Sequence, residues 1–150
     1  MDYPAQLSRM ISKPVINAGV PGDTTAMALK RLKEDVLTQS PRIVLITLGG
    51  NDLKNRVPKE TAYQNLKNII ASIQNQGALV IVGGINIPIW GRGFGKMYQK
   101  VCEETQALLI PNIFDEIIGD KSLMSDPIHP NERGYKLMAQ KFYRAMKPYL

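Results

Sequence analysis

Two short polar segments carry residue types suited to acid–base and oxyanion chemistry. Asp126 and His129 lie three residues apart in a turn flanked by prolines. At this spacing the carboxylate can hold the Nδ1 proton of the imidazole, which leaves Nε2 free to act as a base. Asn51 follows the apolar run over residues 43–48, and its side-chain amide can donate hydrogen bonds at the rim of a site. Neither segment supplies a nucleophile.

Gly22 is a third candidate because it comes directly before a predicted helix. Its backbone N–H would lie at the positive end of that helix, where a donor can stabilise an oxyanion. Each residue alone has a simpler explanation: Gly22 could permit a tight turn, and Asn51 could bond to its own backbone. His129 could cap a helix or lie on the surface. The order of two donors and an Asp–His pair along one chain favours a joint catalytic role.

These residues need an alternating framework of strands and helices to bring them together. The predicted strands are residues 15–17, 43–48, 78–83 and 108–110. The predicted helices are residues 3–11, 24–39, 60–75, 94–106 and 130–146, the last with Pro130 at its first position. In the helix over residues 24–39, Met27 is expected to face the core. The alternation indicates an α/β fold whose parallel sheet has right-handed crossovers and helices on both faces.

Size and composition fit one globular domain over residues 1–150, with 44% hydrophobic and 21% charged residues. The 19 Lys and Arg against 13 Asp and Glu give a formal net charge of +6. The basic residues are spread over every predicted helix, so we interpret them as a solvated surface, with attraction to anionic substrates or membrane surfaces as the alternative. No nucleic-acid partner is expected, since the sequence has neither a Gly-rich phosphate loop with lysine nor an aromatic–basic stripe.

The single cysteine, Cys102, excludes an internal disulfide framework and a Cys/His zinc site. Its position in a helical pattern predicts a buried structural thiol. We expect neither a metal nor an organic cofactor. No apolar stretch has the length of a membrane span, and residues 1–4 do not open a signal peptide. The oligomeric state is left open by the sequence.

Three segments closely resemble sequence blocks of the SGNH, or GDSL, hydrolases: Asn17-Ala18-Gly19-Val20-Pro21-Gly22-Asp23-Thr24, Leu48-Gly49-Gly50-Asn51-Asp52 and Asp126-Pro127-Ile128-His129-Pro130-Asn131. The resemblance covers essentially the whole chain and is nearest to bacterial thioesterase I, arylesterase and lysophospholipase. It implies a three-layer α/β/α, flavodoxin-like fold and hydrolysis of acyl esters or thioesters through an acyl-enzyme. It further implies that Gly22 and Asn51 form an oxyanion hole. His129 would act as general base and then acid, oriented by Asp126.

The family's first block, a strand ending in Gly-Asp-Ser with the nucleophilic serine, does not occur in the sequence. Gly22-Asp23-Thr24 fits the second block instead, and Ser125 is not nominated because its place in the sequence would not align its hydroxyl with Nε2 of His129. We therefore expect an N-terminally truncated family member that is nearly inactive alone. The lost strand is central in the family's sheet, so its loss is expected either to leave two open edges or to force the strands over residues 15–17 and 43–48 to pair directly. Unpaired edges favour association, so the chain is expected to aggregate more readily than a longer form.

The loops over residues 53–58 and 85–94 are the expected acyl-binding walls. Ile87, Ile89 and Trp90 would offer apolar surface, although Trp90 could simply pack its loop. The resemblance implies a small-molecule acyl ester or lipid as substrate, of open chain length and leaving group. The alternative function is a non-catalytic SGNH-fold protein that binds acyl or sugar esters or a protein partner. A periplasmic or secreted location is expected if an upstream segment carries a signal peptide, and a cytoplasmic one otherwise.

Overall fold

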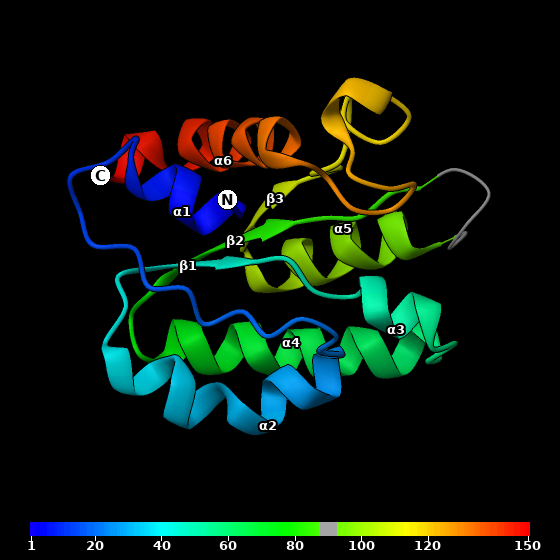
Figure 1. The fold of residues 1–150 in the computed structure, drawn as a ribbon. Helices are drawn as coiled ribbons and strands as arrows, with labels where there is room; N and C mark the ends of the chain where they lie inside the picture. Colours follow the sequence, from blue (N-terminus) through cyan, green and yellow to red (C-terminus); the bar gives the residue numbers. More distant parts are fainter. Residues whose placement is uncertain (88–92) are drawn as a thin grey trace. The chain divides into compact units, whose positions relative to one another are not determined.

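The computed structural model describes residues 1–87 and 93–150 (Figure 1). The chain divides into two compact units. One, here called the terminal unit, comprises Met1–Asn17 and Ile113–Leu150. The other, here called the sheet unit, comprises Ala18–Asn112 and contains the three strands that the structure describes.

Three parallel strands form the sheet, in the order β1-β2-β3. They are β1 (Ile43–Ile46), β2 (Leu79–Gly83) and β3 (Leu108–Ile110). Ile43 lies opposite Leu79, and Ile81 lies opposite Leu108. The central strand β2 is the most deeply buried, as expected for an apolar strand with a neighbour on each side. The predicted α/β class is confirmed by this sheet and the helices between its strands.

The helices of the sheet unit include three long ones, α2 (Thr25–Asp35), α4 (Lys59–Asn75) and α5 (Phe94–Thr105), and two short ones, η1 (Leu37–Gln39) and α3 (Gly50–Lys54). α4 packs on β2, α5 packs on β3 and α4, and α2 packs on α4. The buried stripe of α4 includes Leu66, Ile69, Ile70 and Ile73, whose spacing places them on one helix face. Burial of such stripes against the sheet holds these helices in place.

The predicted strand over residues 15–17 is wrong. These residues form no regular element, and Ile16 is 60% exposed. A strand needs a neighbour to pair its backbone N–H and C=O groups, and in the described part of the chain this segment joins no ladder. Among the described residues, β1 therefore has β2 as its only strand neighbour.

Some details of the predicted helices are also wrong. The first helix ends at Ser8 rather than at residue 11, and α2 ends at Asp35 rather than at residue 39. Met27 is 53% exposed, because α2 buries Ala28 and Leu32 on the face that it presents for packing. The last helix begins at Glu132 rather than Pro130, because the Asn131 side chain caps it.

The terminal unit is built on two helices, α1 (Tyr3–Ser8) and α6 (Glu132–Met146), which pack together. The rings of Tyr3 and Phe142 stack with centroids 5.1 Å apart. The side chain of Asp2 caps α1 by accepting a hydrogen bond from the backbone of Ala5. The unit also contains two short 3-10 helices, η2 (Lys121–Leu123) and η3 (Lys147–Tyr149). In the part of the chain that the structure describes, no helix is both long and apolar enough to cross a membrane.

Candidate active site

Asp126 and His129 form a hydrogen-bonded pair in the terminal unit. Nδ1 of His129 lies 2.8 Å from Oδ2 and 3.0 Å from Oδ1 of Asp126. A carboxylate partner favours the tautomer with the proton on Nδ1, which leaves Nε2 as the basic nitrogen. The two side chains are 48% and 62% exposed, so the pair is accessible. The sequence spacing thus produces the predicted local geometry.

The turn that carries this pair is closed by backbone hydrogen bonds. Oδ1 of Asp126 accepts from the N–H groups of Ile128 and His129, each at 2.9 Å. The N–H of Ser125 donates to the carbonyl of His129 at 2.8 Å, which closes the loop across the turn. The imidazole therefore projects from a backbone that its own partner carboxylate helps to hold.

The start of α6 anchors the turn from the other side. Asn131 accepts a hydrogen bond from the N–H of Gly134 at 3.1 Å and donates through Nδ2 to the carbonyl of Ser122 at 2.9 Å. Gly134 allows the loop to approach closely, since a Cβ there would lie 2.3 Å from the carbonyl oxygen of Leu123. Sequence reasoning missed the anchoring role of Gly134, because a glycine inside a helix carries no signal of what lies against it.

The pKa of the Asp126 carboxyl is lowered from its ordinary value, first by the backbone N–H of Ile128 and then by the ring of His129. A lowered native pKa means that the ionised carboxylate stabilises the folded turn above the unfolded-state pKa, about 3.9, and that this contribution is lost as the pH falls through the native value. We expect the side-chain carboxyl carbon of Asp126 to titrate by NMR with a midpoint below about 3.9.

The amide shift of Ile128 should follow the same midpoint, and the Asp126→Asn variant should lack that step. A midpoint at or above the ordinary value would show that these hydrogen bonds do not form in solution.

Gly22 and Asn51 are linked through Asp23 in the sheet unit. Asn51 is in the first turn of α3, and its Nδ2 donates to the backbone carbonyl of Asp23 at 3.0 Å. Asp23 directly follows Gly22, so the two predicted donors are brought together. The amide of Asn51 has a second hydrogen for another acceptor. The N–H of Gly22, in a turn with φ +88°, donates to no other residue in the described ranges.

A buried carboxylate that sequence reasoning missed connects the helices on which these donors depend. Asp52 is fully buried, and it accepts hydrogen bonds from the N–H of Thr25 at 2.8 Å and from its hydroxyl at 2.6 Å. Asn65 of α4 donates to the same hydroxyl at 3.2 Å. Asp52 thereby fastens α3 to the N-terminal end of α2 (Figure 1).

Tyr98 holds the chain just before α3. Its hydroxyl donates to the carbonyl of Leu48 at 2.5 Å and occupies the space beside Gly49, where a Cβ would lie 2.1 Å away. Gly49 has φ +113°, a conformation that side chains other than glycine rarely adopt. Burial, and secondarily the charge of Asp52, raise the pKa of Tyr98, so the hydroxyl remains a donor. Sequence reasoning missed this contact because Tyr98 and Leu48 are 50 positions apart in the sequence.

Only one of the three predicted acyl-contact residues can be placed. Ile87 is partly buried, whereas Ile89 and Trp90 lie outside the described residues.

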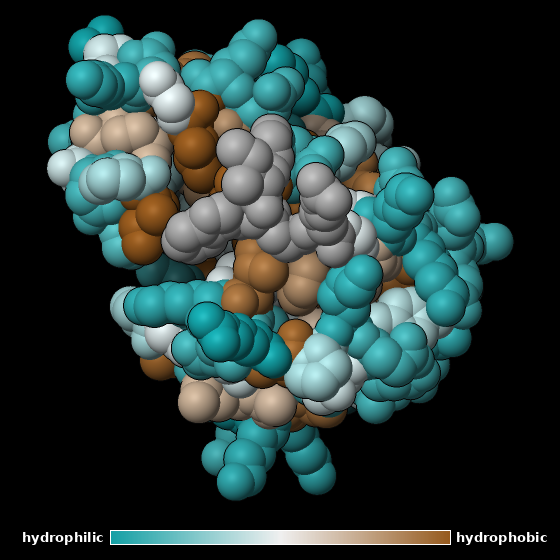
Figure 2. Space-filling model, turned by 90° about the vertical axis from the view of Figure 1, so that its right-hand side faces the viewer, coloured by the Kyte–Doolittle hydropathy of each residue, from teal (hydrophilic) through white to brown (hydrophobic). Residues whose placement is uncertain are grey.

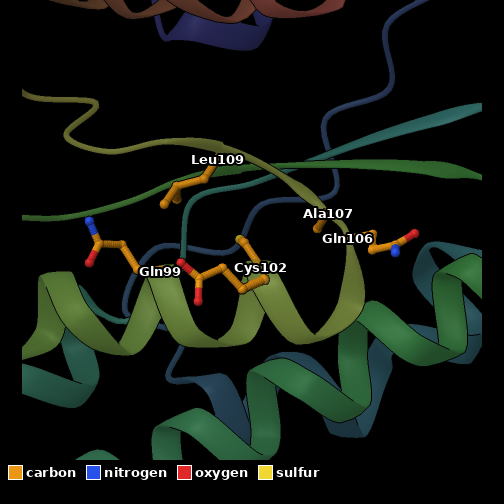
Figure 3. A pocket seen from close by; sticks show the side chains of 6 residues that line it. Gln99, Cys102, Gln106, Ala107 and Leu109 are labelled. Carbon is orange, nitrogen blue, oxygen red and sulfur yellow. The ribbon is translucent and has the colours of Figure 1, made fainter.

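A shallow pocket of about 360 Å³ lies elsewhere, between α5 and β3 (Figure 3). It is lined by Gln99, Cys102, Glu103, Gln106, Ala107 and Leu109, none of which is a predicted site residue. Cys102 is buried as predicted, and burial raises the pKa of its thiol to about 11, which keeps it protonated and unreactive.

In the coloured part of the face in Figure 2, hydrophilic residues surround hydrophobic areas. Some of the charge is paired locally, as between Lys67 and Glu104, 3.0 Å apart. Within residues 1–87 and 93–150, no group of three or more His, Cys, Asp or Glu side chains is arranged to hold a metal ion.

Comparisons with known proteins extend these local similarities to the whole chain. An arylesterase of Vibrio mimicus is 32% identical over 132 residues, which cover 84% of this chain and 66% of the relative. Thioesterase 1/protease 1/lysophospholipase L1 of Escherichia coli K12 is 30% identical over 141 residues, covering 89% of this chain and 67% of the relative. The chain thus spans about two thirds of the length of these curated relatives.

Comparison with solved structures shows the same similarity. The crystal structure of TesA superposes with a TM-score of 0.92 at 27% sequence identity, over 99% of this chain and 89% of that one. The family model for the GDSL-like lipase/acylhydrolase family matches residues 1–137. With this match spanning most of the sequence and the fold in agreement, the chain belongs to the GDSL-like lipase/acylhydrolase family.

Proposed function

We propose that this chain carries the base and the oxyanion-binding groups of a serine ester hydrolase. The observation that carries the proposal is the hydrogen bond between Asp126 and His129, which orients an accessible imidazole. In this mechanism Nε2 of His129 takes the proton of a serine hydroxyl while that oxygen attacks the ester carbonyl. The protonated ring then donates to the leaving group, and the same cycle with water releases the acid.

The developing oxyanion would be held by the N–H of Gly22 and the amide of Asn51. Support comes from the hydrogen bond that the amide of Asn51 donates to the carbonyl of Asp23, the residue after Gly22. Donors that are fixed before the reaction need no reorganisation when charge develops, and one such donor contributes about a hundredfold to a thousandfold in rate. Gly22 and Asn51 are therefore proposed to stabilise the transition state rather than the bound ester.

We also propose that the nucleophile comes from a segment outside these 150 residues, which together form part of one SGNH-type domain. The sequence contains no Gly-Asp-Ser, and no other serine occupies a comparable context. Removing the nucleophile from a comparable triad lowers turnover about a millionfold. The 150-residue chain alone is accordingly proposed to be nearly inactive.

The proposed substrates are small acyl esters or thioesters. This class is suggested by the names of the relatives, an arylesterase and a thioesterase/lysophospholipase. Ile87, Ile89 and Trp90 remain the proposed apolar contacts for the acyl chain.

The second candidate is a non-catalytic relative that binds acyl or sugar esters or a protein partner. It is favoured by one observation, the lack of Gly-Asp-Ser. The two candidates differ in whether the chain becomes a hydrolase when a serine is supplied.

A fluorophosphonate probe tests the proposal, because it forms a covalent bond with an activated serine. The probe is applied to the 150-residue chain and to a longer, serine-bearing chain, in which a segment ending in Gly-Asp-Ser, like the family's first sequence block, precedes Met1. We expect labelling of the serine in the longer chain only, and none after its replacement by alanine. A folded longer chain that stays unlabelled, or labelling of the 150-residue chain at Ser125, would reject the proposed assignment.

A further inference from the structure

We propose that Arg31 is a positioning residue that holds the Gly22 and Asn51 donors in place. It does so by clamping the loop over residues 18–23 from two sides. This inference rests on the proposed function for its catalytic meaning, but the clamp itself is a property of the sheet unit alone, because all of the residues involved belong to that unit.

The guanidinium of Arg31 binds both ends of the loop. Its Nε donates to Oδ2 of Asp23 at 2.6 Å, and its Nη1 donates to the backbone carbonyl of Ala18 at 2.6 Å. The side chains of Arg31 and Asp23 are 24% and 12% exposed, so the ion pair is largely shielded from water. Hydrogen bonds between charged groups in such surroundings are shorter and stronger than neutral ones.

These two anchor points bracket residues 19–22. Between them the N–H of Asp23 donates to the carbonyl of Val20 at 3.2 Å, and Gly22 takes a positive φ. Glycine gives this loop much conformational freedom, which the two bonds from Arg31 at residues 18 and 23 restrict. The guanidinium is planar and rigid, so it can hold two acceptors at a fixed separation, which a lysine ammonium cannot do in the same way.

Asp23 links this clamp to the second donor. Its carboxylate binds Arg31, while its backbone carbonyl accepts from Nδ2 of Asn51. A shift of Asp23 would therefore displace the Gly22 N–H and the Asn51 amide together. Displacements of about 1 Å in such groups can lower a rate a hundredfold.

A direct electrostatic role of Arg31 is disfavoured by its partners. In addition to Asp23, its Nη1 lies 3.3 Å from Oδ2 of Asp35. Two carboxylates thus compensate the single positive charge, which leaves little of it to attract a substrate anion. We therefore assign Arg31 a positioning role rather than a direct electrostatic one.

The clamp is tested first in the 150-residue chain by 15N relaxation of the backbone amides of residues 19–23. We expect order parameters near 0.85 in the parent protein and below about 0.6 in Arg31→Gln, with an intermediate value in Arg31→Lys. Lys33→Gln is the matched control, because it removes a charge from the same helix at an exposed position. Unchanged amides in α4 show that each variant is folded. Equal loop order in Arg31→Gln and the parent would overturn the inference.

The catalytic meaning is tested in the longer, serine-bearing chain with p-nitrophenyl butyrate. Arg31→Gln should lower kcat about tenfold to a hundredfold with KM changed less than about twofold, because the donors act in the transition state. Arg31→Lys should recover part of the loss. A mobile loop with an unchanged kcat would overturn the positioning role. If the longer chain with Arg31 intact is inactive, the proposed function fails, while the relaxation data still decide whether the clamp exists.

Discussion

Replacing His129 by alanine in the longer, serine-bearing chain should lower kcat for p-nitrophenyl butyrate about a millionfold, the loss measured for the histidine of a comparable triad. The reason is that Nε2 of His129 takes the serine proton in the proposed mechanism, and its partner Asp126 is a carboxylate whose lowered pKa makes it a weak base at neutral pH. Without the imidazole, the serine hydroxyl stays protonated and is a poor nucleophile.

Two further variants should lower kcat by smaller factors. Asp126→Asn keeps the size of the side chain but favours the wrong tautomer of His129, so about a ten-thousandfold loss is expected. Asn51→Ala removes one oxyanion donor and should cost about a hundredfold to a thousandfold. The measurement is steady-state kinetics with the serine-to-alanine chain as background. A His129→Ala rate within tenfold of the parent would show that another residue is the base.

Thr25→Val should lower the free energy of unfolding of the 150-residue chain by about 2–3 kcal/mol, because it deprives a buried carboxylate of a hydrogen bond. Valine has nearly the shape of threonine, so packing is preserved and the change isolates the hydroxyl. In the native protein this hydroxyl lies 2.6 Å from Oδ2 of Asp52, a side chain with no exposed surface. Asn65 would lose its acceptor on Thr25 as well.

Thr25→Ser is the matched control, since serine retains the hydroxyl and loses only a methyl group. Its expected cost is about 1 kcal/mol. Urea unfolding followed by circular dichroism measures both variants, with equal slopes required for a valid comparison. If valine and serine destabilise the protein equally, the bond to Asp52 does not contribute as the structure indicates.

Much of the fold could be predicted because it depends on local patterns. The apolar runs that became β1, β2 and β3 are bounded by glycine or proline, and the periodic stripe of α4 is continuous over its whole length. The sequence could not show that residues 15–17 form no strand. Their pattern suits a strand, but strand formation depends on a neighbour, and no local pattern contains that information.

The candidate site likewise has one part that the sequence predicts and another part that only the folded chain reveals. The sequence by itself predicted the Asp126–His129 pair, because the two residues are three apart and a turn of this length can bring their side chains together. Only the tertiary structure decided that Arg31 brackets the loop before α2, that Tyr98 fits against Gly49, and that Asp52 joins α3 to α2. These contacts join residues 13 to 50 positions apart, so they form only when packed helices and strands bring the partners within hydrogen-bonding distance.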